Sequence, residues 1–173
     1  MNRLIALLML LLLSPLFVMV ALAIFLEDGA PVFFVQKRVG KNYSFFALYK
    51  FRTMKKDTPN VATHLLDNPK QYLLGLGGLL RKLSLDELPN LVNIVRGEMA
   101  FVGPRPALYN QEDLMALRLA AGVEKQMPGI TGWAQINGRD SISLEEKVAL
   151  EKYYLDNQSL ALDLKILWRT LFK

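Results

Sequence analysis

The sequence predicts an α+β fold in which an N-terminal membrane helix precedes a small, mostly helical domain with one short β-hairpin. Three observations lead to this prediction: an apolar run at residues 4–26, two β-rich segments at residues 32–35 and 45–52, and helical periodicity over much of the chain after residue 72. A chain of 173 residues has room for one compact domain beside such a membrane segment.

The composition excludes several kinds of site. The chain has no cysteine, which rules out a disulfide framework, a thiolate zinc site and a cysteine nucleophile. Its single histidine, His64, rules out a metal site built from histidines. The net charge of +5 indicates a phosphate-bearing partner, which could be a nucleic acid, an anionic membrane or a nucleotide-linked substrate.

The N-terminal apolar run has the length of a membrane helix. Residues 4–26 contain no ionisable side chain, and a helix of that length extends about 35 Å, enough to cross the hydrocarbon of a bilayer. A cleaved secretory signal is the alternative, because Ala21-Leu22-Ala23 has the pattern of a cleavage site. The run continues past that tripeptide, which favours membrane attachment.

A Ser-Pro pair interrupts this run. Pro15 has no N–H and its ring crowds the preceding turn, so we expect the helix to bend there. The hydroxyl of Ser14 can bond a backbone group that the bend frees. The pair is consistent with a re-entrant segment that enters and leaves by one face, and equally with a kinked spanning helix.

The next segment predicts a basic β-hairpin. Residues 32–35 and 45–52 are rich in β-formers, and turn residues lie at 40–42. Strand alternation places Lys50 and Arg52 on one face. Seven basic and no acidic residues occur at 37–56, so this surface is either a solvated or lipid-facing basic patch or a phosphate site.

A polar loop at 57–70 and a leucine-rich segment at 73–83 lead to two adjacent carboxylates, Asp86 and Glu87. Ser84 and Glu87 have the spacing of a capping box, an apolar stripe follows, and Gly97 marks the end of the predicted helix. The two carboxylates therefore lie at a helix start, where they either cap the helix and offset its dipole or perform chemistry.

Cations flank these carboxylates along the chain. Arg81 lies just upstream, and Arg105 follows between two prolines that stiffen its loop, an arrangement suited to bidentate phosphate binding. One carboxylate could attack phosphorus while its neighbour handles a proton, with the arginines and a divalent cation stabilising the phosphoryl oxygens. A glycosidase pair fits less well, because its carboxylates must flank a sugar from opposite sides.

The C-terminal part predicts two more helices. Ser143 and Glu146 form a second possible capping box for a helix that runs towards residue 155. In a following helix at 160–172, one face carries Leu164, Leu167, Trp168 and Leu171. That face suits a helix at the membrane interface or, alternatively, one packed on the core.

Four motifs, in order, resemble the bacterial sugar transferase family, the monotopic phosphoglycosyl transferases. They are YKFRTM at 49–54, LDELP at 85–89, VGPRP at 102–106 and PGITGWAQ at 128–135, of which the last could also be a plain turn cluster. Together they extend over nearly the whole chain, whose length resembles the minimal catalytic form of the family.

The resemblance implies a reaction and roles for named residues. Family members transfer a sugar 1-phosphate from a UDP-sugar to polyprenol phosphate, usually undecaprenyl phosphate, with Mg²⁺ and release of UMP. By this likeness Asp86 is the nucleophile that forms a phosphosugar intermediate and lies against the metal, and Glu87 is the base for the polyprenol phosphate. The residues implied to bind substrate are Lys50, Arg52, Arg81, Arg105 and, in a loop near the nucleotide, Arg139.

The resemblance also implies a location. The Ser-Pro break corresponds to that of the family's re-entrant helix, so we expect residues 1–27 to form a re-entrant membrane helix. Residues 28–173 would form a cytosolic catalytic domain with interfacial helices, at the cytoplasmic face of the bacterial inner membrane. Two departures stand out: Glu98 replaces the Asp of many relatives, and the short segment between residues 54 and 81 could reshape the donor pocket.

Two other classes share some of these features. A membrane-anchored scaffold would explain the apolar run, and a nucleic-acid-binding protein would explain the basic hairpin. The nucleic-acid binder does not explain two carboxylates between arginines. We therefore expect a UDP-sugar, undecaprenyl phosphate and membrane lipid as partners, with downstream glycosyltransferases as possible further partners and no nucleic acid.

Overall fold

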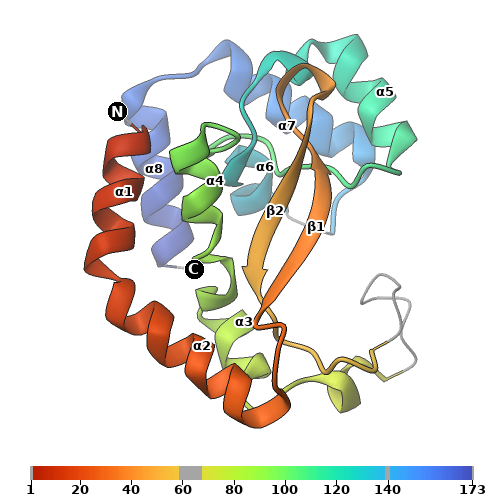
Figure 1. Ribbon diagram of the computed structural model, residues 1–173. Coiled ribbons are helices and arrows are strands. Elements are labelled where there is room, and N and C mark those ends of the chain that lie inside the picture. Colours follow the sequence, from red (N-terminus) through yellow and green to blue (C-terminus); the bar gives the residue numbers. More distant parts are fainter. Residues whose placement is uncertain (1, 59–67, 139–140, 173) are drawn as a thin grey trace.

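A computed structural model describes residues 2–58, 68–138 and 141–172 of the chain (Figure 1). It confirms the α+β class, mostly helical with two small two-stranded sheets. The helices are α1 (Asn2–Leu12), α2 (Ser14–Asp28), α3 (Gly77–Lys82), α4 (Asn90–Arg96), α5 (Glu112–Ala121), α6 (Trp133–Asn137), α7 (Leu144–Asp156) and α8 (Leu160–Leu171). The strands are β1 (Phe33–Val39), β2 (Phe45–Phe51), β3 (Ala100–Val102) and β4 (Gly129–Thr131), and short 3-10 turns occur at Lys41–Tyr43, Pro69–Tyr72, Leu85–Glu87 and Val123–Lys125.

The apolar N-terminal run forms two helices that meet at a bend. α1 and α2 are inclined at 62° to one another, with the break at the Ser-Pro pair. In a straight helix the carbonyl of Leu11 would accept the N–H of residue 15, which Pro15 lacks. The hydroxyl of Ser14 donates to that carbonyl instead, at 2.8 Å. The bend therefore leaves the Leu11 carbonyl bonded.

Within the described residues, no single helix is both long and apolar enough to cross a bilayer. The bent pair of α1 and α2 passes the same test when the two are taken together, by length and composition alone.

One side of the bent pair packs on the domain and the other is exposed. Ala6 of α1 is fully buried in a cluster with Leu91 and Ile94 of α4. Ile24 of α2 packs in a second cluster with Phe51, at the end of β2. Figure 1 shows the pair along one edge of the molecule. Its exposed apolar side chains are Leu4, Ile5, Leu7, Leu8, Leu11, Leu12, Val18, Met19, Leu22, Phe25 and Leu26.

The predicted hairpin is present and is longer than expected in its first strand. β1 pairs antiparallel with β2, with Phe33 opposite Phe51 and Arg38 opposite Phe46. This register pairs Lys50 with Phe34, which lies four residues before Arg38 in β1. Arg38 and Lys50 are therefore on the same face of the hairpin.

Arg52 joins the hairpin to the end of α2. Its guanidinium forms an ion pair with Asp28 and donates to the carbonyls of Asp28, Gly29, Pro31 and Met54. The residue is 6% exposed. Arg52 thus fixes the direction in which the chain leaves the apolar helices.

A second pair of strands replaces the turn cluster considered as one alternative for residues 128–135. β3 pairs with β4 in parallel, and Gly103 N–H donates to the carbonyl of Thr131 at 2.9 Å. Gly129 lies so close to this backbone that an added Cβ would be 2.2 Å from the nitrogen of Gly103. The glycine is therefore needed for the approach of the two strands.

The C-terminal helices follow the prediction. The capping box of α7 is confirmed, because Ser143 Oγ accepts the N–H of Glu146 and the Glu146 carboxylate accepts the N–H of Ser143. α8 buries Ile166 completely and packs Leu167, whereas Trp168 is 63% exposed. The helix therefore packs on the core through one face and presents an apolar second face.

Replacing Arg52 tests its structural role. We expect Arg52→Met to lower the free energy of unfolding by about 2–4 kcal/mol, because several carbonyls and the carboxylate of Asp28 lose their donor. Urea unfolding of the detergent-solubilised protein measures the change. The matched control is Lys55→Met, which removes an exposed cation nearby. Equal stability of the two variants would contradict the assignment.

Candidate active site

Asp86 and Glu87 lie on a 3-10 turn that connects α3 to α4. The turn follows Ser84, whose φ of 55° is in the left-handed region. The predicted capping box is wrong: the side chain of Ser84 makes no capping bond, and the carboxylate of Glu87 is bonded elsewhere. The predicted end of the helix is correct, because Gly97 adopts φ 80° directly after α4.

Glu87 is held by two cations from distant parts of the chain. Its Oε1 atom accepts from Lys50 Nζ at 2.7 Å and from Arg105 Nη2 at 3.0 Å. Burial acts to raise the pKa of Glu87, but the two cations outweigh it and lower the pKa to about 2. Glu87 is therefore ionised at neutral pH.

Asp86 has the opposite environment. Burial is the largest effect and raises its pKa, Lys50 and Arg81 act in the lowering direction, and the neighbouring Glu87 adds to the rise. The net pKa shift is upward. No cation among the described residues forms an ion pair with Asp86, so its oxygens remain available for an electrophile or a metal ion.

Arg81 and Arg105 reach the carboxylates from opposite directions along the chain. Arg81 lies in α3, its Nε donates to Thr53 Oγ1 at 2.9 Å, and its charge acts on Asp86. The residue is exposed and its remaining donors point to no partner among the described residues. Arg81 can therefore bind an anion that approaches Asp86.

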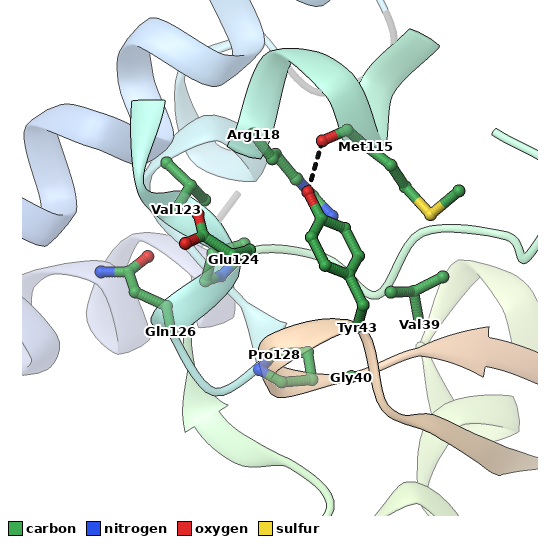
Figure 2. A pocket seen from close by; sticks show the side chains of 10 residues that line it. Val39, Gly40, Tyr43, Met115, Arg118, Val123, Glu124, Gln126 and Pro128 are labelled. Carbon is green, nitrogen blue, oxygen red and sulfur yellow. Dashed lines mark hydrogen bonds between the residues drawn. The ribbon is translucent and has the colours of Figure 1, made fainter. Parts of the chain in front are cut away.

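The loop that carries Arg105 is fixed from below by a buried ion pair. Arg118 of α5 contacts both carboxylate oxygens of Glu151, at 2.8 and 2.6 Å, and donates to the backbone carbonyl of Arg105 at 2.9 Å. Glu151 is 1% exposed. Figure 2 shows Arg118 beside Tyr43 in a hollow, with the Tyr43 hydroxyl bonded to the carbonyl of Met115. Pro104, the residue before Arg105, also lines this hollow.

The structure brings together most, but not all, of the residues predicted for the site. Lys50, Glu87 and Arg105 are in direct contact, and Asp86 and Arg81 lie beside them. Arg52 is occupied at the end of α2, so its assignment to substrate binding stays a prediction that this geometry does not favour. Arg139 lies outside the described residues.

Two residues that the sequence did not single out support the site. Asn93 of α4 is fully buried, accepts the N–H of Tyr49 and donates to the carbonyl of Ala47, so it ties α4 to β2. Arg38 of β1 is close enough to Glu87 and Arg105 for their charges to act on it. The alternation of the hairpin was the available signal for Arg38.

The donor set fits a magnesium ion that is shared with substrate. Within the described part of the chain, no group of three acidic or histidine side chains could hold a metal ion alone. Mg²⁺ commonly uses one or two carboxylates together with water and substrate phosphates. Asp86 offers such a carboxylate, whereas Oε1 of Glu87 already accepts from two cations.

The low pKa of Glu87 predicts a stability difference that depends on pH. A carboxylate with an ordinary pKa of 4.5 and a folded pKa of about 2 stabilises the fold above pH 4.5, and the effect is lost as the pH falls towards 2. We expect the stability gap between wild type and Glu87→Gln to narrow by up to about 3 kcal/mol between pH 7 and pH 2.

Urea unfolding at a series of pH values measures this gap. The control is Glu112→Gln, which changes an exposed carboxylate at the start of α5. A gap for Glu87→Gln that stays constant over the whole pH range would show that the two cations do not depress the pKa.

Comparison with known proteins agrees with the motifs. The family model described as bacterial sugar transferase matches residues 1–173. A chain named uncharacterized sugar transferase EpsL, from Bacillus subtilis, is 48% identical over 148 residues, which cover 86% of this chain and 72% of the relative.

Two further relatives carry more specific names. The exopolysaccharide production protein ExoY of Sinorhizobium fredii is 39% identical, over 97% of this chain and 80% of its own length. The UDP-glucose:undecaprenyl-phosphate glucose-1-phosphate transferase of Escherichia coli is 38% identical over 97% of this chain but only 38% of its own length. The predictions of family and of an enzyme of the phosphoglycosyl transferase class are confirmed, and the chain belongs to the bacterial sugar transferase family.

Proposed function

We propose that this enzyme transfers a sugar 1-phosphate from a UDP-sugar to undecaprenyl phosphate and releases UMP. Relatives are named for this kind of reaction with glucose, galactose or N-acetylgalactosamine. The observation that carries the proposal for this chain is the contrast between two adjacent carboxylates. Glu87 is clamped by Lys50 and Arg105, whereas Asp86 has no ion pair among the described residues.

In the proposed first step, an oxygen of Asp86 attacks the phosphorus that bears the sugar. The bond from that phosphorus to the bridging oxygen of the diphosphate breaks, and UMP leaves with the bridging oxygen. The product on the enzyme is an acyl phosphate that carries the sugar. Arg81 and Lys50 act on Asp86 electrostatically and are close enough to offset negative charge on the phosphoryl oxygens.

In the proposed second step, a phosphate oxygen of the polyprenol phosphate attacks the same phosphorus. The bond to Asp86 breaks, the carboxylate is restored, and a diphosphate links the sugar to the lipid. Glu87 takes the proton of the incoming phosphate. A carboxylate with a pKa of about 2 is a weak base. This role therefore requires Lys50 and Arg105 to bind substrate phosphates first, which weakens their interaction with Glu87.

A magnesium ion belongs to this proposal through Asp86. When bound, Mg²⁺ would neutralise charge on the phosphoryl oxygens of the donor. Asp86 would hold the ion together with phosphates of the donor. Arg81 and Arg105 remain responsible for orienting the phosphates.

The bent helix pair supports a membrane location that suits both substrates. We propose that residues 1–27 form a re-entrant segment and that residues 28–173 form a catalytic domain on the cytoplasmic face of the inner membrane. The bend of 62° and the exposed apolar side of α1 and α2 support this topology. The exposed Trp168 of α8 suits contact with the headgroup region. The lipid-linked product would then serve downstream glycosyltransferases.

Asp86→Asn tests the proposed nucleophile. We expect this variant to lose at least about a thousand-fold of UMP release, because an amide cannot form the acyl phosphate. UMP is measured with a panel of UDP-sugars and undecaprenyl phosphate in the presence of Mg²⁺. Intact mass spectrometry of wild type with donor alone should detect the added sugar phosphate, which Asp86→Asn should lack.

Asp113→Asn serves as the matched control, since Asp113 is an exposed carboxylate in α5. It should retain wild-type turnover. Full activity of purified Asp86→Asn would remove the nucleophile assignment, and wild type without UMP release from any donor would remove the proposed reaction.

The absence of cysteine makes the topology directly testable. We expect single cysteines at Asn2→Cys and Lys41→Cys to react with a membrane-impermeant maleimide in inverted vesicles, and neither to react in spheroplasts. Unsubstituted protein gives the background. Labelling of the residue 2 cysteine from the periplasmic side would instead identify a spanning helix.

A further inference from the structure

A small hollow beside Glu87 is lined by more positive than negative charge. The charged residues that line it are three cations, Arg38, Lys50 and Arg105, and one carboxylate, Glu87. Two of these cations already share one oxygen of Glu87. Three cations around a single carboxylate leave an excess of positive charge, which favours binding of a further anion.

Arg38 is only partly used by the protein. Its Nη1 donates to the carbonyl of Pro106 at 3.0 Å, and its Nη2 donates to Gln36 Oε1 at 2.6 Å. Its Nε is buried and has no partner among the described residues. Burial, followed by the charge of Arg105, lowers the pKa of Arg38 to about 10, so the side chain is still cationic at neutral pH.

Asn90, which lines the same hollow, also has an unpartnered polar atom. The residue is 2% exposed, and its Oδ1 atom is buried without a hydrogen-bond partner in the part of the chain that the structure describes. Buried polar atoms in folded proteins are nearly always bonded, so an unbonded donor and an unbonded acceptor on two residues that line one hollow indicate a polar ligand. Leaving both unbonded would cost the desolvation of each group.

Phosphate chemistry matches these groups. We propose that Arg38 and Asn90 bind a phosphate group of a substrate beside Glu87, together with Lys50 and Arg105. The Nε–H of Arg38 donates to a phosphoryl oxygen, and Asn90 Oδ1 accepts from a hydroxyl on or next to that phosphate. This inference rests on the proposed function, in which both the nucleotide donor and the lipid acceptor bring phosphates to the site.

Calorimetric binding of inorganic phosphate and pyrophosphate to the full chain in detergent tests the site without turnover. We expect Arg38→Gln to weaken binding by about ten-fold or more, because a charged donor is lost. Arg38→Lys keeps the charge without the Nε–H and should also weaken binding. Asn90→Ala removes the acceptor and should have a smaller effect in the same direction.

The matched control is Lys37→Gln, which removes an exposed cation from the position directly before Arg38 in β1. It should leave phosphate binding unchanged within about two-fold, as a neighbour on the other face of the strand. Melting temperatures of all variants are measured alongside. If both Arg38 variants melt early yet bind phosphate as wild type does, Arg38 has a structural role only and the proposal is overturned.

Kinetic arms identify the source of the phosphate. If the Arg38 variants need a higher donor concentration than wild type for half-maximal UMP release in a single turnover, the subsite binds the UDP-sugar. If they need a higher acceptor concentration than wild type for half-maximal rate in the full reaction, the subsite binds the polyprenol phosphate. Either result supports the proposal, and unchanged values for both substrates would overturn it. Failure of wild type to release UMP would remove the proposed function, and the calorimetric comparison would still decide whether Arg38 binds phosphate.

Discussion

The contact of Glu87 with Lys50 and Arg105 is the interaction on which the site depends. It joins the hairpin, the turn before α4 and the loop after β3, three segments that are far apart in the sequence. A partly buried carboxylate between two cations is stable only if all three groups are held in place. The remaining structure provides this support, through Asn93 between α4 and β2 and through Arg118 under the loop.

The same framework fixes the site relative to the apolar surface. α1 packs along α4, which begins three residues after Glu87, and Arg52 ties the end of α2 to the hairpin that carries Lys50. A rigid path of packed side chains therefore connects the exposed apolar edge to the carboxylates. For an enzyme whose proposed acceptor is a lipid phosphate, this path would set the height of Asp86, the proposed nucleophile, relative to the proposed membrane surface.

Local signals in the sequence predicted the local features well. The β-formers predicted the hairpin, Gly97 predicted the end of α4, and the Ser143 capping box is present with both of its hydrogen bonds. The corresponding box at Ser84 fails because the carboxylate of Glu87 is drawn to cations 37 and 18 positions away. Three-residue strands such as β3 and β4 form too short a pattern to predict.

The motifs predicted most residues of the site, but not which acidic partner each cation contacts. Lys50 and Arg52 are two positions apart, yet one contacts Glu87 and the other is consumed by the end of α2. Phosphate oxygens of a bound substrate would compete with the Glu87 carboxylate for Lys50 and Arg105. Because those cations keep Glu87 ionised and weakly basic in this arrangement, its proposed proton transfer becomes favourable only after substrate has drawn them away. In the proposed mechanism, the contacts of Lys50 and Arg105 with Glu87 thus couple substrate binding to the basicity of Glu87.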